Sequence, residues 1–103
     1  MLCALTVRKL KPGTFDEFKA GFGPPEEAAH QGWVRFHMLR GTSDENEVVT
    51  FGFFDGTVEQ LEQSQRQHGY AERVQDISPL VEEVISNGVY EVILSNKLEG
   101  AAA

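Results

Sequence analysis

Three residues at alternating positions, Trp33, Arg35 and His37, carry the side chains best suited to chemistry in this sequence. They fall in residues 33–40, which we predict to be a strand, and alternate residues of a strand point to the same face. Together they offer a ring for stacking, a permanent cation and an imidazole that titrates near neutral pH. We expect Trp33 to stack on an aromatic ligand, Arg35 to hold its phenolate or enolate oxygen, and His37 to act as the catalytic base.

This arrangement requires the opposite face of the strand, formed by Val34, Phe36 and Met38, to pack on helices. Further substrate-binding residues are expected from other elements, and all carry polar or aromatic side chains: Arg8, Thr50, Phe54, His68, Tyr90 and Glu91.

A structural interpretation of the same residues stays open. In it, Trp33 fills an interface, Arg35 pairs with Glu91, and His37 makes a hydrogen bond inside the fold. His68, near the end of a predicted helix, is explained equally well by the favourable interaction of a histidine with the helix dipole.

Motifs for metals and cofactors are absent from the sequence. The histidines at positions 30, 37 and 68 have no second ligand at a spacing that suits a metal, and there is no dinucleotide fingerprint, phosphate-binding loop or nucleophile elbow. With one cysteine, Cys3, no internal disulfide can form, and a reducing cytoplasm is the expected compartment. We therefore expect no metal and no cofactor.

The composition argues against nucleic-acid and membrane partners. The 103 residues carry a net charge of −7, whereas nucleic-acid binding requires clustered Lys and Arg. No apolar run reaches about 18 residues, the minimum for a membrane helix. The charge is uneven, +2 over residues 1–40 and −9 over residues 41–103. The basic strands of the first part are compatible with a small anionic or polyphenolic ligand, or simply with solvated strand ends.

Two similar stretches, residues 12–18 and 51–60, each predict a turn followed by a helix start. Thr57 and Gln60 form a capping-box pattern, and Thr14 and Glu17 form a second one. The chain therefore resembles two copies of a strand–turn–helix unit.

The patterns along the chain predict a ferredoxin-like α+β fold. Strands are expected at residues 2–10, 33–40, 47–54 and 89–94, and helices at 14–22 and 58–68. An extra helix is expected at 79–87, where Pro79 follows an N-cap Ser78 and Asn87-Gly88 forms the C-cap. A short helical piece is expected at 26–31. The order β-α-β-β-α-β gives a four-stranded antiparallel sheet with helices on one face. We expect one domain at 1–96 and a loosely held tail at 97–103.

Three of the predicted strands are apolar on both faces, although helices can cover only one. In residues 47–54, Val49, Phe51 and Phe53 share one face, while Val48, Thr50 and Phe54 share the other. An exposed apolar sheet is costly in water and normally marks an interface. We therefore expect a homodimer that packs sheet to sheet around a cavity, a dimeric α+β barrel.

Residues 51–63, Phe-Gly-Phe-Phe-Asp-Gly-Thr-Val-Glu-Gln-Leu-Glu-Gln, resemble a strand and the following helix of antibiotic-biosynthesis-monooxygenase-like proteins. Residues 6–18 resemble the first strand, Pro-Gly turn and first helix of the same family. The resemblance implies a homodimer of ferredoxin-like subunits with one ligand cavity per subunit. Some family members oxygenate polycyclic phenols without metal or flavin, and others bind and degrade haem.

The resemblance leaves several functions to compare. The first is a cofactor-independent monooxygenase-like enzyme that acts on an aromatic or polyketide-like molecule in a cavity of the dimer. The second is a non-catalytic small-molecule-binding or scaffold homodimer. Haem binding or degradation is disfavoured, because His68 lies about a helical turn too late for the haem-degrading pattern.

Overall fold

Four strands form one antiparallel sheet in the computed structural model, which describes residues 1–22, 31–96, 98 and 100. The spatial order of the strands is β2-β3-β1-β4. Along the chain the elements are β1 (Leu2–Leu10), α1 (Phe15–Gly21), β2 (Trp33–Arg40), β3 (Glu47–Phe54), α2 (Val58–Gln67), α3 (Tyr70–Ile77), a 3₁₀ turn (Ser78–Leu80) and β4 (Val81–Glu91). The predicted strands at 2–10, 33–40 and 47–54 are confirmed.

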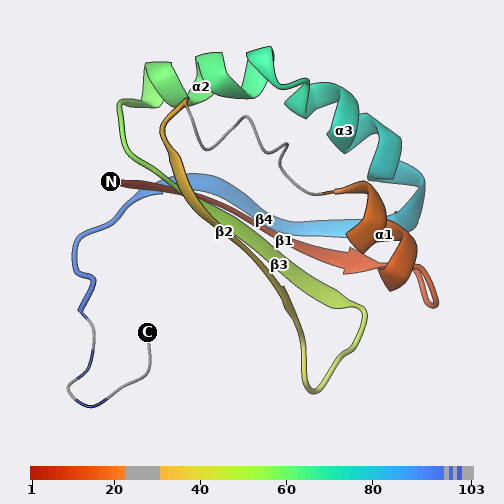
Figure 1. Cartoon of the computed structure of the whole chain (residues 1–103). Helices are drawn as coiled ribbons and strands as arrows, with labels where there is room; N and C mark the ends of the chain where they lie inside the picture. The colour runs from red at the N-terminus through yellow and green to blue at the C-terminus, as the bar shows by residue number, and fades with distance from the viewer. Residues whose placement is uncertain (23–30, 97, 99, 101–103) are drawn as a thin grey trace.

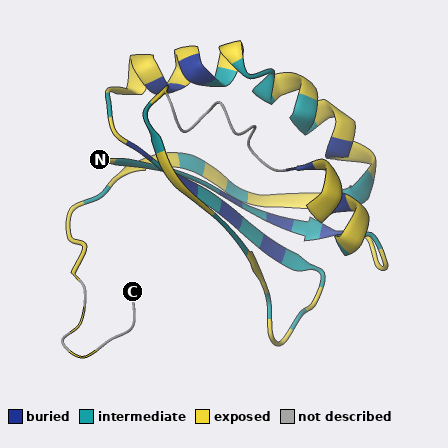
Figure 2. Ribbon diagram, in the orientation of Figure 1, coloured by how far each residue is buried: buried dark blue, intermediate teal, exposed yellow. Residues whose placement is uncertain are grey.

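Within the described residues, α1, α2 and α3 lie on the same side of the sheet (Figure 1). α2 and α3 form an arch across it, and their inner surfaces are buried or half-buried while their outer surfaces are exposed (Figure 2). We call this side the covered face; its buried residues on β1 and β3 are Thr6, Arg8, Leu10, Val48, Thr50, Gly52 and Phe54. The opposite side is the open face, which carries Cys3, Leu5, Val7, His37, Leu39, Val49, Phe51, Phe53 and Tyr90.

The α2 start has the predicted capping box, but the α1 start does not. The Gln60 backbone N–H donates to Thr57 Oγ1 (3.1 Å), and the Thr57 N–H donates to Gln60 Oε1 (2.9 Å). Thr14 caps nothing with its side chain and instead donates its hydroxyl to the Lys11 carbonyl at 2.7 Å. The second predicted capping box is therefore wrong, because the Thr14 backbone (φ −106°, ψ 3°) lacks the extended conformation that Thr57 has (φ −88°, ψ 165°) and that an N-cap typically adopts.

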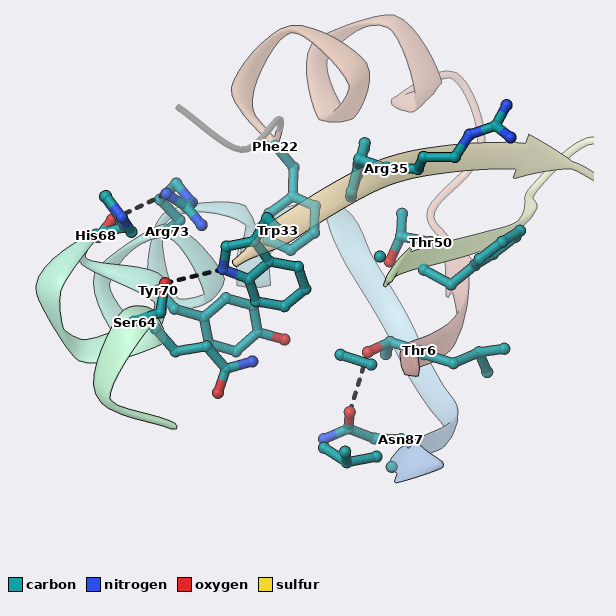
Figure 3. Close-up of a pocket in the computed structure, with 18 of the residues that line it drawn as sticks. Thr6, Phe22, Trp33, Arg35, Thr50, Ser64, His68, Tyr70, Arg73 and Asn87 are labelled. Carbon is teal, nitrogen blue, oxygen red and sulfur yellow. Dashed lines mark hydrogen bonds between the residues drawn. The ribbon is translucent and has the colours of Figure 1, made fainter. Parts of the chain in front are cut away.

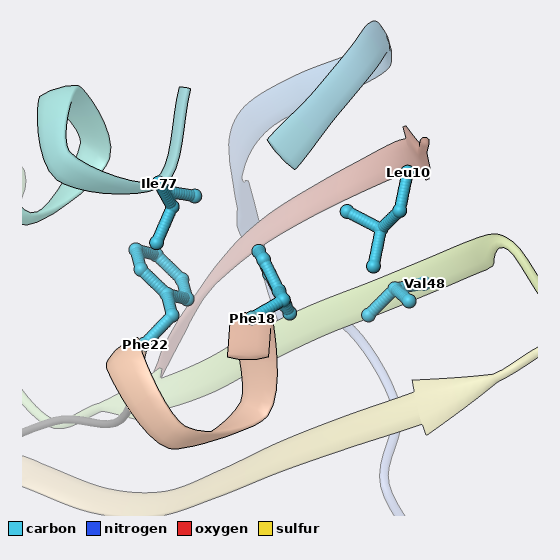
Figure 4. Packing of buried hydrophobic residues seen from close by; sticks show 5 residues of the cluster. All are labelled: Leu10, Phe18, Phe22, Val48 and Ile77. Atoms are coloured by element: carbon cyan, nitrogen blue, oxygen red, sulfur yellow. The ribbon is translucent and has the colours of Figure 1, made fainter. Parts of the chain in front are cut away.

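A small apolar core fixes one end of the helix layer to the sheet (Figure 4). Phe18 and Phe22 of α1 and its C-cap stack with ring centroids 5.4 Å apart, and they pack with Leu10, Val48 and Ile77. Burying such side chains contributes about 1.5–3 kcal/mol each, so this cluster anchors α1 and α3.

The extra helix lies earlier than predicted. Residues 70–77 form α3, and residues 81–91 form one long strand, so the helix predicted at 79–87 is wrong. The reason is two irregularities in the pairing of β4 with β1, which leave Ile85 and Glu82 out of the regular register. Each extra residue shifts the alternation of faces, and the resulting apolar spacing imitates a helix. Pro79 lies in the first turn of the 3₁₀ segment Ser78–Leu80 and begins no α-helix.

The predicted fold class is otherwise confirmed: α+β, ferredoxin-like, with a four-stranded antiparallel sheet. In the described part of the chain, no helix has the length and apolar character needed to cross a membrane. The short helix expected at 26–31 lies outside the described residues except for Gln31, as does most of the tail expected at 97–103.

Candidate functional site

A cavity of about 420 Å³ lies between the covered face of the sheet and the α2–α3 arch. Side chains from every strand contribute to it, and Figure 3 shows how the labelled ones surround the space. Its aromatic and polar lining includes Thr6, Phe22, Trp33, Phe36, Thr50, Ser64, His68, Tyr70, Arg73 and Asn87. A concave site of this volume, mostly apolar with a few polar groups, is typical for small-molecule ligands.

Trp33 is the largest ring in the cavity, and Gly52 makes room for it. A Cβ at Gly52 would lie 2.9 Å from a carbon of the indole ring, so the ring packs directly over the β3 backbone. The indole also packs edge-on against Phe54, with centroids 5.1 Å apart, and its Nε1–H donates to Ser64 Oγ at 2.9 Å. Contacts with both the sheet and α2 therefore hold this ring in one orientation.

The prediction that Trp33, Arg35 and His37 share a face is wrong. Trp33 pairs with Phe54 and Arg35 with Phe53, so the register shifts by one residue between them. Such a bulge moves every following side chain to the other face. Trp33 thus faces the helices, while the side chains of Arg35 and His37 belong to the open face.

His37 and Arg35 lie away from the centre of the cavity. The His37 ring stacks on Phe51, with centroids 4.8 Å apart, and meets the edge of Phe53 on the open face. Arg35 borders the cavity, but its guanidinium points away from Trp33 and Tyr70 (Figure 3). The catalytic roles expected for these two residues remain predictions that the position of the cavity does not support.

The floor of the cavity is polar. Thr6 Oγ1 donates to Asn87 Oδ1 at 3.0 Å, which links β1 to β4 (Figure 3). Next to Thr6 on the sheet lies Thr50, 5% exposed, whose hydroxyl accepts from Arg8 Nη1 at 3.0 Å. These neutral acceptors and donors are what a polar ligand group would meet on the sheet side.

Arg8 is a buried cation beneath the cavity, with 3% of its surface exposed. Its guanidinium lies 4.6 Å from the centroid of the Phe22 ring, within the range of a cation–π interaction. Burial lowers the pKa of Arg8 from its ordinary value, and the neighbouring Tyr70 offsets part of this effect. Arginine nevertheless stays protonated at neutral pH. Among the described residues, no carboxylate forms an ion pair with it.

The junction of α2 and α3 supplies the remaining polar groups. Gly69, with φ of +65°, lies between the two helices in the left-handed conformation that favours glycine. Arg73 Nη1 donates to the backbone oxygen of His68 at 2.9 Å, and Tyr70 lies beside Trp33 (Figure 3). The buried Nε of Arg73 and Nε2 of His68 have no hydrogen-bond partner among the described residues.

The other expected site residues are spread over the molecule. Phe54 is 2% exposed and supports Trp33 from below, and it borders a second, smaller hollow instead of the main cavity. Tyr90 is half exposed on the open face. Glu91 lies on the strand at the edge opposite to β2, about 14 Å away across three strand spacings. An Arg35–Glu91 pair within one chain is therefore wrong.

Several cavity residues were missed by the sequence reasoning. Tyr70, Val74 and Ile77 follow an i, i+4, i+7 pattern that predicts a helix, and Arg73 shares the Tyr70 side of it. Reading that pattern would have placed Tyr70 and Arg73 on the inner surface of α3. Asn87 was assigned to a helix end, and nothing local in the sequence indicates its contact with Thr6.

The described residues also bear on metal binding and on cysteine reactivity. Within that part of the chain, no group of three His, Cys, Asp or Glu side chains could hold a metal ion. Burial raises the pKa of the Cys3 thiol, which disfavours the reactive thiolate.

The sequence matches no protein-family profile and no curated protein. Solved structures do match. A protein from Nitrosomonas europaea described as a candidate antibiotic biosynthesis monooxygenase superposes with a TM-score of 0.75 at 16% identity, over 91% of this chain and 100% of its own. A variant of SnoaB, a cofactor-independent oxygenase from Streptomyces nogalater, gives 0.70 at 17% identity, over 91% and 94%.

A variant of MhuD with two manganese protoporphyrin IX molecules per active site gives a TM-score of 0.69 at 16% identity, over 94% of this chain and 99% of its own. At these identities the likeness concerns the fold. The chain therefore has the fold of the antibiotic-biosynthesis-monooxygenase-like proteins, as residues 51–63 and 6–18 had indicated.

Proposed function

We propose that this protein binds a planar aromatic or polyketide-like molecule in the cavity between sheet and helices, and oxygenates it without metal or flavin. The observation that carries the proposal is the cavity itself, about 420 Å³, with the fixed Trp33 ring beside Tyr70. Rigid aromatic rings bind flat ligands well because they lose little conformational freedom. The fold likeness to a cofactor-independent oxygenase supports the type of reaction.

In this proposal Trp33 keeps the stacking role expected from the sequence, but other residues supply the polar contacts. Thr6, Asn87 and Arg73 lie at the cavity wall and would orient oxygen atoms of the ligand. His68 is the imidazole of the described cavity lining, so we assign proton removal to it in place of His37.

The chemistry requires only a base, a substrate that can form a stabilised carbanion, and dioxygen. Removal of a proton from the methylene carbon of an anthrone leaves a delocalised carbanion that gives an electron to O₂. Recombination forms a carbon–oxygen bond, and loss of water then leaves a carbonyl. The balance is CH₂ plus O₂ to C=O plus H₂O, and the carbon alone is oxidised.

The test is oxygen uptake with anthrone as substrate, compared in the wild type, His68→Ala and His37→Ala. We expect a rate above spontaneous autoxidation, a loss of about 100-fold or more in His68→Ala, and little change in His37→Ala, since a positioned base contributes about 10²–10⁴-fold. A rate equal to autoxidation would reject the enzyme. A large loss in His37→Ala alone would restore the assignment made from the sequence.

We also propose that two copies associate through the open face. Leu39 and Tyr90 are 48% and 49% exposed there, and they surround the half-buried Phe51 and Phe53. Apolar surface left in water costs about 25 cal/mol per Å², so a second copy is the partner that covers it best. The cavity lies on the other side of the sheet, so each subunit would keep its own site. The homodimer expected from the sequence is retained, but the site moves to the covered face.

Two alternatives predict different measurements. A binding protein without turnover would bind aromatic ligands but consume no oxygen. A haem protein would give a Soret band that shifts on titration with haemin and is lost in His68→Ala, because the imidazole is the ligand that the cavity offers to iron. We expect no such shift.

A further inference from the structure

The cavity differs in charge from the rest of the protein. The chain carries a net charge of −7. Among the described residues that line the cavity, however, Arg73 is a permanent cation on the helix side, and none is Asp or Glu. A concave site lined with one sign of charge focuses its field and raises the local concentration of the opposite ion. The rest of the protein is acidic overall, so it would not attract an anion as the cavity would.

Arg73 is the cation best placed to meet a ligand. Its Nη1–H donates to the His68 backbone oxygen at 2.9 Å, which holds the guanidinium at the α2–α3 junction (Figure 3). Its buried Nε–H has no acceptor, and no described carboxylate forms an ion pair with it. The described part of the protein therefore leaves the charge of Arg73 uncompensated.

Arg8 adds a second positive charge from beneath. Its guanidinium is buried and donates to Thr50, which lines the cavity, and it lies against the Phe22 ring. A charge in such a poorly solvated position is screened much less than a surface charge. Arg73 thus lines the cavity on the helix side, while the buried charge of Arg8 lies behind Thr50 on the sheet side.

We propose that the ligand is an aromatic anion, whose carboxylate or phenolate oxygen binds at the Arg73 end of the cavity while its ring lies on Trp33. This inference rests on the proposed binding function and specifies its ligand class. Arginine suits the task because its planar fork of N–H donors matches a charged oxygen group. Neutral aromatic molecules of equal size would bind more weakly, because they leave these donors without a charged acceptor.

The experiment compares 2-naphthoate with its neutral analogue 2-naphthamide by isothermal titration calorimetry on the full-length protein. We expect naphthoate to bind at least about tenfold more tightly, as one charge-assisted contact provides. Raising NaCl from about 0.05 to 0.5 M should weaken naphthoate binding and leave naphthamide binding unchanged. This comparison uses the wild type alone, so it does not depend on the folding of any variant.

Two arginine variants locate the effect. Arg73→Gln should reduce the preference for naphthoate at least about fivefold, whereas Arg66→Gln, on the exposed surface of α2, removes the same charge and should leave it within about twofold. Equal affinity for the two probes, or equal losses in both variants, would overturn the anion site while aromatic binding stands. Failure of both probes to bind below about 1 mM would instead reject the proposed function itself, and the anion site with it.

Discussion

The two faces of the sheet depart from the usual distribution of side chains. The face beneath the helices carries Thr6, Arg8 and Thr50, all at most 6% exposed, while the face without helices carries Phe51 and Phe53. A sheet with one wet side normally places its polar residues on that side. The difference supports the two proposed uses, in which polar residues under the helices contribute to a ligand cavity and the apolar residues opposite form an interface between subunits.

β3 contains this contrast within three consecutive residues. Thr50 and Gly52 face the helices, where Thr50 binds Arg8 and Gly52 receives the Trp33 ring. Phe51, between them, faces the other way and stacks on His37. Single substitutions in this segment can therefore test the two proposed uses of the sheet separately.

The largest effect is expected from Phe51→Glu. A charge in the centre of the open face would have to be buried without a partner in the dimer, so the dissociation constant should rise about 100-fold or more, about 2.8 kcal/mol. Sedimentation equilibrium at low micromolar concentration measures it. Val58→Glu makes the same change at an exposed position of α2 and should leave the mass unchanged. If the wild type sediments as a stable monomer, the proposal that the apolar open face forms a dimer interface is rejected.

A smaller effect is expected from Thr50→Val on the covered face. The substitution keeps the shape but removes the acceptor of Arg8 Nη1, and a buried charged donor without a partner costs about 2 kcal/mol. Urea denaturation at a fixed protein concentration measures the change. Thr6→Val is the matched control, since it removes a hydrogen bond between neutral groups and should cost about 1 kcal/mol or less. Similar losses in the two variants would mean that the charge of Arg8 is satisfied elsewhere.

The smallest effect is expected from Gly52→Ala. The added Cβ would lie 2.9 Å from the Trp33 ring, which must move, at a cost of about 1 kcal/mol. The chain has a single tryptophan, so its fluorescence spectrum should shift and ligand binding should weaken. Gly21→Ala serves as the control, because its Cβ would meet Ile77 at an ordinary 3.9 Å and alanine favours the helix. An unchanged spectrum in Gly52→Ala would show that Trp33 is not held against β3.

The errors in the predicted strand faces and in the predicted extra helix have one main physical cause, the bulges in the sheet. Alternation of side chains is reliable along an uninterrupted strand, and β1, β2 and β3 have the bounds that it predicts. It fails at bulges, because one extra residue exchanges the faces of everything that follows. A bulge after Trp33 separates this ring from Arg35, and two irregularities in β4 gave that strand the spacing of a helix.

Sequence patterns for helix capping also predict only part of what the structure shows. Thr57 and Thr14 stand in equivalent sequence patterns, yet only Thr57 forms its capping box. The Thr14 hydroxyl turns to the Lys11 carbonyl, an acceptor that the preceding turn brings within 2.7 Å. A propensity predicts which groups can bond, whereas the surrounding chain decides which bond forms.

The sequence by itself determined the ferredoxin-like order of elements, the two-sided apolar strands and the absence of recognisable metal or cofactor motifs, because these depend on periodicity and residue type. The tertiary structure alone decided where the site lies. Thr6 meets Asn87, and Trp33 meets Ser64, across long stretches of chain. Contacts between residues so distant in sequence depend on strand register and helix packing, and these are set by the whole fold and not by any local pattern.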